Sequence, residues 1–241
     1  MAITNSGSRG RGSGRRHVTA QLVVDAAERL TADRGLQGWS IRQLAAELDV
    51  WPTVIYHHVG DREAVMDAVT ARVVGRIPCP EVDTPWRDWF RTVLVEGRRV
   101  VRSFPGVAFR LAQKGPVTDS ALPLIDRGVE VLTRAGFGSE APAVFSILMN
   151  GAFFLVAWED EHHATPVSYH RLTSFLRSFR GDGARPGLAA MGEYVDQVPA
   201  GDMEAFHGGH HSLLVDVLLD GAAARLTTRQ GGGEEVPAVT G

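Results

Sequence analysis

Apolar residues recur at helical spacing along almost the whole chain, and no stretch alternates between apolar and polar residues as a strand would. In the first third, this pattern predicts helices at about 19–34, 40–48 and 52–58. Further helices are predicted at about 85–102, 104–113, 118–135, 140–160, 167–179 and 203–227, separated by proline and glycine. The sequence therefore predicts an all-α protein.

Two of the predicted helices are short and follow each other closely. Ser40 is a good N-cap for the first, because its hydroxyl accepts a hydrogen bond from an otherwise unpaired amide. A turn at Asp49 separates them, and Pro52 suits the first position of the second helix. Gly60 ends that helix and Asp61 caps the next one. This order predicts a helix-turn-helix.

The second short helix has an inward apolar side, where we expect Ile55 and Val59 to pack. Its outward side carries polar, aromatic and small side chains: Thr53, Val54, Tyr56, His57 and His58. A face of this size and chemistry suits the major groove of DNA. Two alternatives stay open, namely that Tyr56 packs the two short helices together and that His57 is a solvated surface residue.

With these pieces in register, the segment from Val18 to Val69 resembles the DNA-binding domain of the TetR family of one-component repressors. The amphipathic helix from Thr19 to Arg34, the break at Gly35-Leu36 and the two short helices all match. Trp51 departs from the residues that many relatives have near this position, which leaves the base preference open.

The resemblance also implies DNA contacts for particular residues. Arg42 resembles a base- or phosphate-contacting residue of the first short helix. The contacts of the recognition helix are implied for Thr53, Tyr56 and His58, and Arg62 resembles the basic phosphate contact at the start of the following helix.

The charge of the chain is nearly balanced, with 25 basic and 28 acidic residues. Positive charge for DNA must therefore be local, and it gathers in the Gly/Ser-rich residues 1–17, which include Arg15 and Arg16. We expect a disordered arm that lies along phosphates or in a minor groove. The alternative is a tail that only improves solubility.

The sequence lacks the motifs that would indicate an enzyme, a metal-binding protein or a membrane protein. Cys79 is the only cysteine, which excludes an intramolecular disulfide and a cysteine-cluster metal site. The sequence has no His-Glu-x-x-His, nucleophile elbow or Gly-rich phosphate loop, so we expect no enzyme activity and no cofactor. We also expect no apolar leader and no run long enough to span a bilayer, hence a cytoplasmic protein without membrane contact.

Glycine and proline at residues 75–80 mark the expected boundary between a DNA-binding domain (18–76) and a helical regulatory domain (77–228), followed by a disordered tail (229–241). Two later segments, Pro142–Trp158 and His211–Leu226, are too apolar to be hidden easily in one small domain. In TetR-like proteins the corresponding helices form a four-helix bundle with a second subunit. The resemblance thus implies a homodimer on a palindromic operator, and the alternative is a monomer core.

The regulatory domain is rich in aromatic residues, and the resemblance implies a cavity for a small-molecule effector that releases the repressor from DNA. The residues expected to line it are Trp86, Trp89, Phe104, Phe109, Asn150, Phe153, Phe154 and Trp158. Glu159 and Arg110 are further polar candidates. Two alternatives remain: that these aromatics form core, and that the C-terminal half only dimerises or recruits partners.

Clustered histidines raise a metal-sensing alternative. Acidic residues and histidines gather at 159–163, while His207, His210 and His211 open the last helix. Adjacent His210 and His211 cannot face one metal from a regular helix. We therefore favour a solvated helix end and expect no metal site.

Overall fold

The structure is a computed structural model that describes residues 18–116, 118–164, 166–197 and 203–231. All regular elements in these ranges are helical, which confirms the all-α prediction. The first four helices are α1 (Ala20–Arg34), α2 (Ile41–Glu47), α3 (Pro52–His58) and α4 (Arg62–Val74). The others are α5 (Trp86–Arg102), α6 (Val107–Lys114), α7 (Leu122–Leu132), α8 (Ala141–Ala164), α9 (Pro166–Arg177), α10 (Pro186–Asp196) and α11 (Met203–Gly231). The predicted arm, with Arg15 and Arg16, lies outside the described residues.

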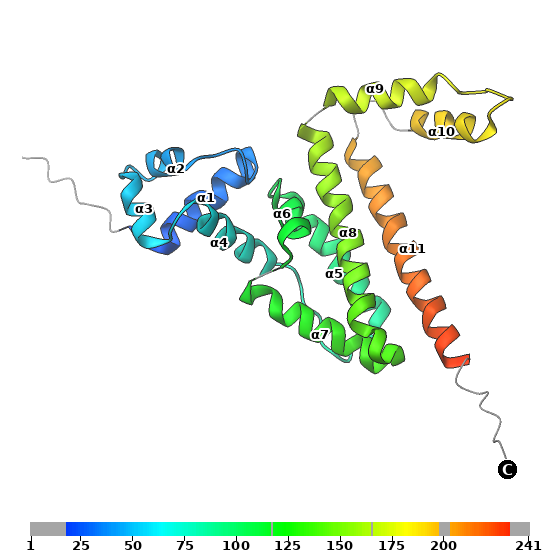
Figure 1. The fold of residues 1–241 in the computed structure, drawn as a ribbon, viewed down its shortest axis with the longest axis horizontal. Coiled ribbons are helices and arrows are strands. Elements are labelled where there is room, and N and C mark those ends of the chain that lie inside the picture. The colour runs from blue at the N-terminus through cyan, green and yellow to red at the C-terminus, as the bar shows by residue number, and fades with distance from the viewer. Residues whose placement is uncertain (1–17, 117, 165, 198–202, 232–241) are drawn as a thin grey trace, which may run out of the picture.

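Helices α1 to α4 form a separate group at one end of the molecule (Figure 1). Their starts are capped by side chains: Thr19 accepts from the Leu22 amide, Ser40 and Gln43 form a capping box, and Asp61 accepts from the Ala64 amide at 2.9 Å. The four helices bury one apolar core, whose fully buried members include Val23, Leu44, Ile55 and Met66. The caps predicted at Ser40 and Asp61 are confirmed.

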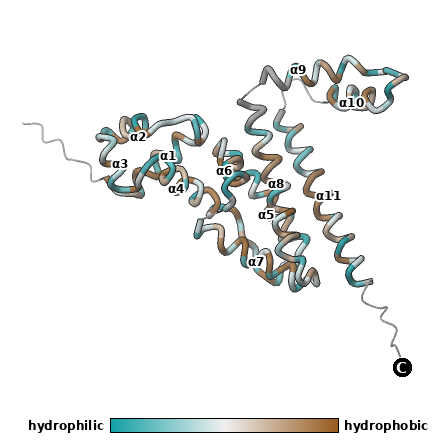
Figure 2. Tube along the Cα trace, viewed as in Figure 1, coloured by the Kyte–Doolittle hydropathy of each residue, from teal (hydrophilic) through white to brown (hydrophobic). Residues whose placement is uncertain are grey.

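Helix α8 is the centre of the regulatory part, and α5, α6, α7 and α11 all pack against it. This explains why its sequence is apolar on several sides. The buried residues around it include Trp89, Phe90 and Leu94 on α5 and Leu148 on α8 itself. Figure 2 shows that apolar residues recur along α5, α7, α8 and α11.

Arginines along α5 join it to α11, which runs in the opposite direction. Arg91 lies 2.7 Å from Asp216, and Arg98 lies 3.4 Å from Glu204. Arg87 pairs with Asp220 one turn beyond the first of these pairs. Most of these groups are at least partly exposed, so each pair contributes little to stability, about 1 kcal/mol or less. Together they fix how α11 is placed lengthwise against α5.

One helix, α10, was not predicted. It packs against α9 in a hairpin that projects beyond the ends of α8 and α11 (Figure 1). A Cβ on Gly192 would lie 2.8 Å from the Leu176 carbonyl oxygen, so glycine allows the two helices to approach closely here. Glycines at 187 and 192 are also unfavourable in a helix interior, which hid the helix from the sequence pattern.

The helical run Asp119–Asp160 is long and apolar enough to cross a membrane by length and composition, contrary to the expectation from the sequence. The run is not a single straight helix, because Gly136 has a φ of 105° inside it. In its most apolar window 44% of the residues are buried within the protein. The contacts of α8 are those of a core helix in a folded domain.

Candidate DNA-binding face and effector cavity

The turn between α2 and α3 sets the exposed face of α3. Asp49 adopts a left-handed conformation with a φ of 54°, and the Val50 amide donates to the Ala45 carbonyl at 3.0 Å. After this turn, Ile55 is fully buried, whereas Thr53, Tyr56 and His57 are exposed and Tyr56 keeps 53% of its surface. A short helix with buried Ile55 and an outward polar and aromatic face has the form of a recognition helix.

Two of the predicted outward residues on α3 are less exposed than expected. Val54 is half-buried and packs against the core, next in sequence to the fully buried Ile55. His58 is also half-buried, and its ring lies edge-on to His57 with 5.2 Å between centroids. Of the predicted set, Thr53, Tyr56 and His57 therefore present the most surface. Arg42 on α2 is exposed as well.

The guanidinium of Arg62, which was expected to contact a phosphate, forms hydrogen bonds with other residues of the protein. Its Nε donates to the Trp39 carbonyl at 3.0 Å, and its two terminal nitrogens donate to the side chain and carbonyl of Gln37, each at 3.1 Å. The guanidinium also lies over the Trp39 ring, 5.3 Å from its centroid. Arg62 thus holds the loop between α1 and α2 in place.

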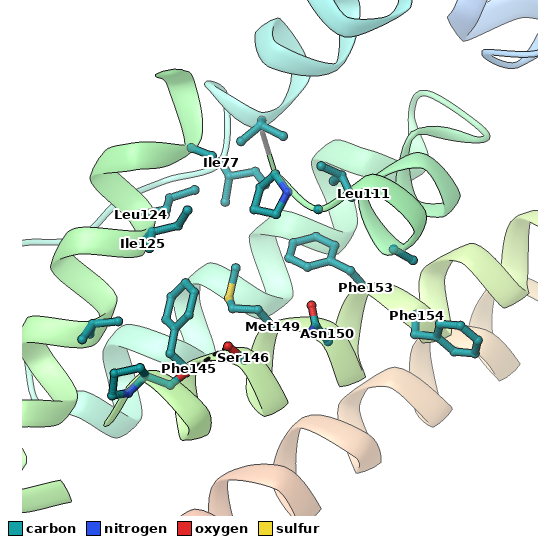
Figure 3. A pocket seen from close by; sticks show the side chains of 17 residues that line it. Ile77, Leu111, Leu124, Ile125, Phe145, Ser146, Met149, Asn150, Phe153 and Phe154 are labelled. Atoms are coloured by element: carbon teal, nitrogen blue, oxygen red, sulfur yellow. Dashed lines mark hydrogen bonds between the residues drawn. The ribbon is translucent and has the colours of Figure 1, made fainter. Parts of the chain in front are cut away.

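A cavity of about 580 Å³ lies between α6, α7 and α8 and reaches the end of α4 (Figure 3). The residues that line it are Val74, Ile77, Leu111, Ala112, Gly115, Pro116, Ala121, Leu124, Ile125, Val129, Pro142, Phe145, Ser146, Met149, Asn150, Phe153 and Phe154. This size suits a drug-sized molecule.

Three of the eight predicted effector contacts, namely Asn150, Phe153 and Phe154, line this cavity. The contribution of α7 and the end of α4 was missed. Phe145 and Met149 are in the same apolar segment as Phe153. Nothing in the sequence distinguishes the residues of this segment that line a cavity from those that pack in the core.

The other five predicted aromatics lie elsewhere. Trp89 is fully buried and donates from its indole to the Pro80 carbonyl at 3.0 Å. Trp86 packs edge-on to Phe137, and the Arg76 guanidinium covers the Phe104 ring. Phe109 is exposed, and Trp158 contacts His207 at the far end of α8. Trp86, Trp89 and Phe104 therefore pack within the protein core, as the alternative interpretation of these aromatics expected.

The charged candidates Arg110 and Glu159 do not line the cavity either. Arg110 is 6% exposed, and its Nε donates to Asp67 on α4 at 3.1 Å. Burial lowers the pKa of Arg110, but its hydrogen bonds to Asp67 and Glu63 outweigh that effect and raise it. Glu159 is buried beside Arg98, with 3.0 Å between Oε2 and Nη2, and burial raises its pKa despite this partner.

The histidines of α11 split between two sides of the helix. His207 and His211 are one turn apart and both buried, whereas His210 is only partly buried. Burial, together with the positive charge of Arg98, lowers the pKa of His211 to about 4. Within the described ranges, no group of three or more His, Cys, Asp or Glu residues could hold a metal ion. The side chains of His162 and His163 lie outside the described residues.

Helix α6 connects the cavity with the DNA-binding helices. Leu111 on α6 lines the cavity, while neighbouring Arg110 pairs with Glu63 and Asp67 on α4. Just before α6, the Pro105 carbonyl accepts from the Leu36 amide at 2.8 Å. The regulatory part therefore contacts both α4 and the loop between α1 and α2.

A face of α8 and α11 exposes large apolar residues. Phe154 on α8 is 66% exposed and Leu213 on α11 is 62% exposed. Ile147, two turns before Phe154, and Val217, one turn after Leu213, are exposed as well. The two helices pack closely, since a Cβ on Gly151 would lie 3.2 Å from the Leu218 side chain. An apolar surface of this kind is typical of an interface.

The fold and the exposed face of α3 are those of a helix-turn-helix DNA-binding regulator. The sequence model for bacterial regulatory proteins of the tetR family matches residues 23–69. An HTH-type transcriptional regulator from Saccharopolyspora erythraea is 30% identical over 122 residues, which cover 50% of this chain and 52% of that protein. Residues 23–69 thus match the DNA-binding part of the tetR family, and the chain is similar to TetR family transcriptional regulators.

Further comparisons agree with this family. The class D tetracycline repressor protein of Escherichia coli is 28% identical over 84 residues, which are 34% of this chain and 38% of the repressor. The match thus spans about half the length of the curated relatives or less. The crystal structure of ActR from Streptomyces coelicolor in complex with actinorhodin has the same fold, with a TM-score of 0.68 and 18% identity over 86% of this chain and 97% of ActR.

Proposed function

We propose that the protein is a cytoplasmic repressor that binds a palindromic operator as a homodimer and leaves it when a small molecule occupies the cavity. The observation that carries this proposal is the double role of α6, which lines the cavity through Leu111 and is paired with α4 through Arg110. An effector that fits best when α6 is displaced favours a different position of α4. Since α4 follows α3 directly, the two recognition helices of a dimer then lose their spacing on DNA.

The exposed apolar face of α8 and α11 supports the homodimer. Its residues Ile147, Phe154, Leu213 and Val217 would bury their surface in a two-fold bundle with the same face of a second copy. Two recognition helices would then meet two operator half-sites. Relatives that carry bound molecules, such as ActR with actinorhodin, support a ligand for the cavity.

The DNA contacts proposed for this dimer follow from exposure. Thr53, Tyr56 and His57 enter the major groove from α3, with Val54 and His58 at the edge of this surface. Arg42 holds a phosphate, Arg62 reaches one while it keeps its hydrogen bonds to the loop between α1 and α2, and Arg15 and Arg16 add sequence-independent contacts.

A mobility-shift titration on the DNA that flanks its own gene tests this function, at stated salt, with and without extracts of its host. Specific binding that an extract releases supports a ligand-gated repressor. Specific binding that no extract disturbs favours a protein whose C-terminal half only dimerises or recruits partners. A chelator that changes the affinity would instead favour metal sensing.

A further inference from the structure

We infer that the cavity selects an uncharged, mostly apolar molecule with one polar end, such as an alcohol, ester or lactone, held at Asn150. This inference rests on the proposed function, because it names the class of effector for the same cavity. It follows from which polar groups reach the cavity and which do not.

The described lining of the cavity carries no ionisable side chain. The two charged groups that seemed available in the sequence are committed elsewhere, Arg110 to Asp67 and Glu159 to Arg98. A carboxylate or ammonium group in this cavity would therefore lose part of its hydration without gaining an opposite charge. This loss makes a charged ligand bind more weakly than its neutral counterpart.

Polar atoms of the lining side chains are concentrated on one face of α8. Ser146 and Asn150 are one turn apart on that helix, and Figure 3 shows the Asn150 amide between Met149 and Phe153. The Ser146 hydroxyl donates to the Pro142 carbonyl at 2.9 Å and so keeps only its acceptor role for a ligand. Within the described residues, the Asn150 side chain has no hydrogen-bond partner, which leaves both its donor and its acceptor for a ligand.

Burial sets the orientation of the ligand. Ser146 and Asn150 are exposed, whereas Leu124, Phe145 and Phe153 are buried. The apolar body of the ligand therefore lies inward among the buried side chains, and its polar end lies at the open side of the cavity, beside Asn150. A single neutral amide at that point recognises a hydroxyl or carbonyl oxygen and offers nothing that favours a full charge.

Two fluorescent probes that differ only at the polar end test this inference: 1-pyrenebutanol and 1-pyrenebutyrate. Each is titrated into the full-length protein without DNA, and binding is followed by pyrene fluorescence. We expect the neutral alcohol to bind at least about 10-fold more tightly than the carboxylate. Equal affinity, tighter binding of the carboxylate, or no binding of the alcohol would overturn the inference.

Variants at Asn150 decide whether this residue sets the preference. Asn150→Leu should weaken the alcohol about 2- to 10-fold because it removes one neutral hydrogen bond. Asn150→Lys should favour the carboxylate, because it places a positive charge at the open side of the cavity. Ala143→Lys adds the same charge on α8 at an exposed residue outside the lining and should leave the preference unchanged. If Ala143→Lys acts like Asn150→Lys, the preference reflects the overall charge and the inference fails.

A failure of the inference and a failure of the proposed function give different results. If the alcohol binds preferentially but no molecule releases the protein from DNA, the ligand class stands and gating fails. If an extract releases the protein while the two probes bind equally, gating stands and the ligand class fails.

Discussion

Arg110 on α6 donates to Asp67 on α4 at 3.1 Å, which joins the helix beside the cavity to the helix that follows the recognition helix. The same guanidinium reaches Glu63, at 3.1 Å from its Nη2. Asp67 and Glu63 are each more than half exposed, so loss of Arg110 leaves them in water rather than buried and unpaired. The pairing is therefore suited to transmit a movement without being essential for folding.

The variant Arg110→Met should uncouple the cavity from DNA. We expect its operator affinity without effector to stay within about 3-fold of the wild type, while the amount of active extract needed for release rises about 10-fold, equivalent to a coupling free energy of about 1.4 kcal/mol. Mobility-shift titrations measure both quantities. Lys114→Met is the matched control, because Lys114 also pairs with Glu63 but is exposed. An unchanged release curve for Arg110→Met would rule out this route.

Tyr56 and Ile55 are neighbours on α3 with opposite roles. Tyr56→Ala should weaken operator binding about 10-fold and leave the melting temperature unchanged, because the side chain is exposed. Ile55→Ala should reduce the free energy of unfolding by roughly 2–5 kcal/mol, because it opens a cavity in the core. Mobility shifts and thermal denaturation separate the two effects, and a large loss of stability in Tyr56→Ala would contradict this assignment.

Arg62→Ala should reduce stability as well as DNA affinity. The side chain makes three hydrogen bonds at 3.1 Å or less to Trp39 and Gln37, so we expect a loss of roughly 1–3 kcal/mol in the free energy of unfolding. If it also holds a phosphate, the slope of log affinity against log salt falls by about 1. Arg42→Ala, at an exposed residue, should change the affinity alone. A stable Arg62→Ala would contradict the structural role.

The proposed dimer predicts that a charge on the exposed face of α11 separates the subunits. Leu213→Glu should give monomers in sedimentation velocity and lose cooperative operator binding, because buried carboxylates would face each other across the two-fold axis. Leu122→Glu is the control, because Leu122 is similarly exposed but lies on α7. A dimeric Leu213→Glu protein would place the interface elsewhere.

Acid should destabilise the protein through His211. Its pKa is lowered to about 4 by burial and by Arg98, so the neutral form is the one that folding favours. This contribution is fully present above the ordinary pKa of about 6.5 and is lost as the pH falls through 4, at most about 3 kcal/mol in all. Urea denaturation between pH 7 and 4 should show a flatter decline for His211→Asn than for the wild type. An identical decline would mean that His211 does not titrate in this range.

The DNA-binding helices could be predicted from sequence because caps, turn and apolar spacing agree there. Ser40 and Asp61 cap the expected helices, and Ile55 is buried as expected. The cavity was predictable only in part, since Phe153 lines it whereas Trp89, of similar chemistry, is core. Helical spacing identifies which residues face inward, but it does not say whether another side chain or a void lies opposite.

Arg62 shows a second limit of sequence patterns. Its place at the start of α4 suggested a phosphate contact, yet its hydrogen bonds run to a loop more than twenty residues earlier in the chain. When the carbonyl oxygens of distant residues accept the hydrogen bonds of a side chain, nothing in the neighbouring sequence indicates it. The same holds for Gly192, which reads as a helix breaker and in fact permits close packing of α10 on α9.

The α9–α10 hairpin separates α8 from α11 in the chain, although these two helices pack directly against each other. Its turn includes Gly181 and Gly183, where an added Cβ would meet nothing within 4 Å. A single peptide bond cut at this turn would therefore leave two fragments held together by the α8–α11 and α5–α11 contacts. The turn is thus the natural place to divide the gene into two co-expressed halves, or to insert a reporter domain, without dismantling the regulatory core.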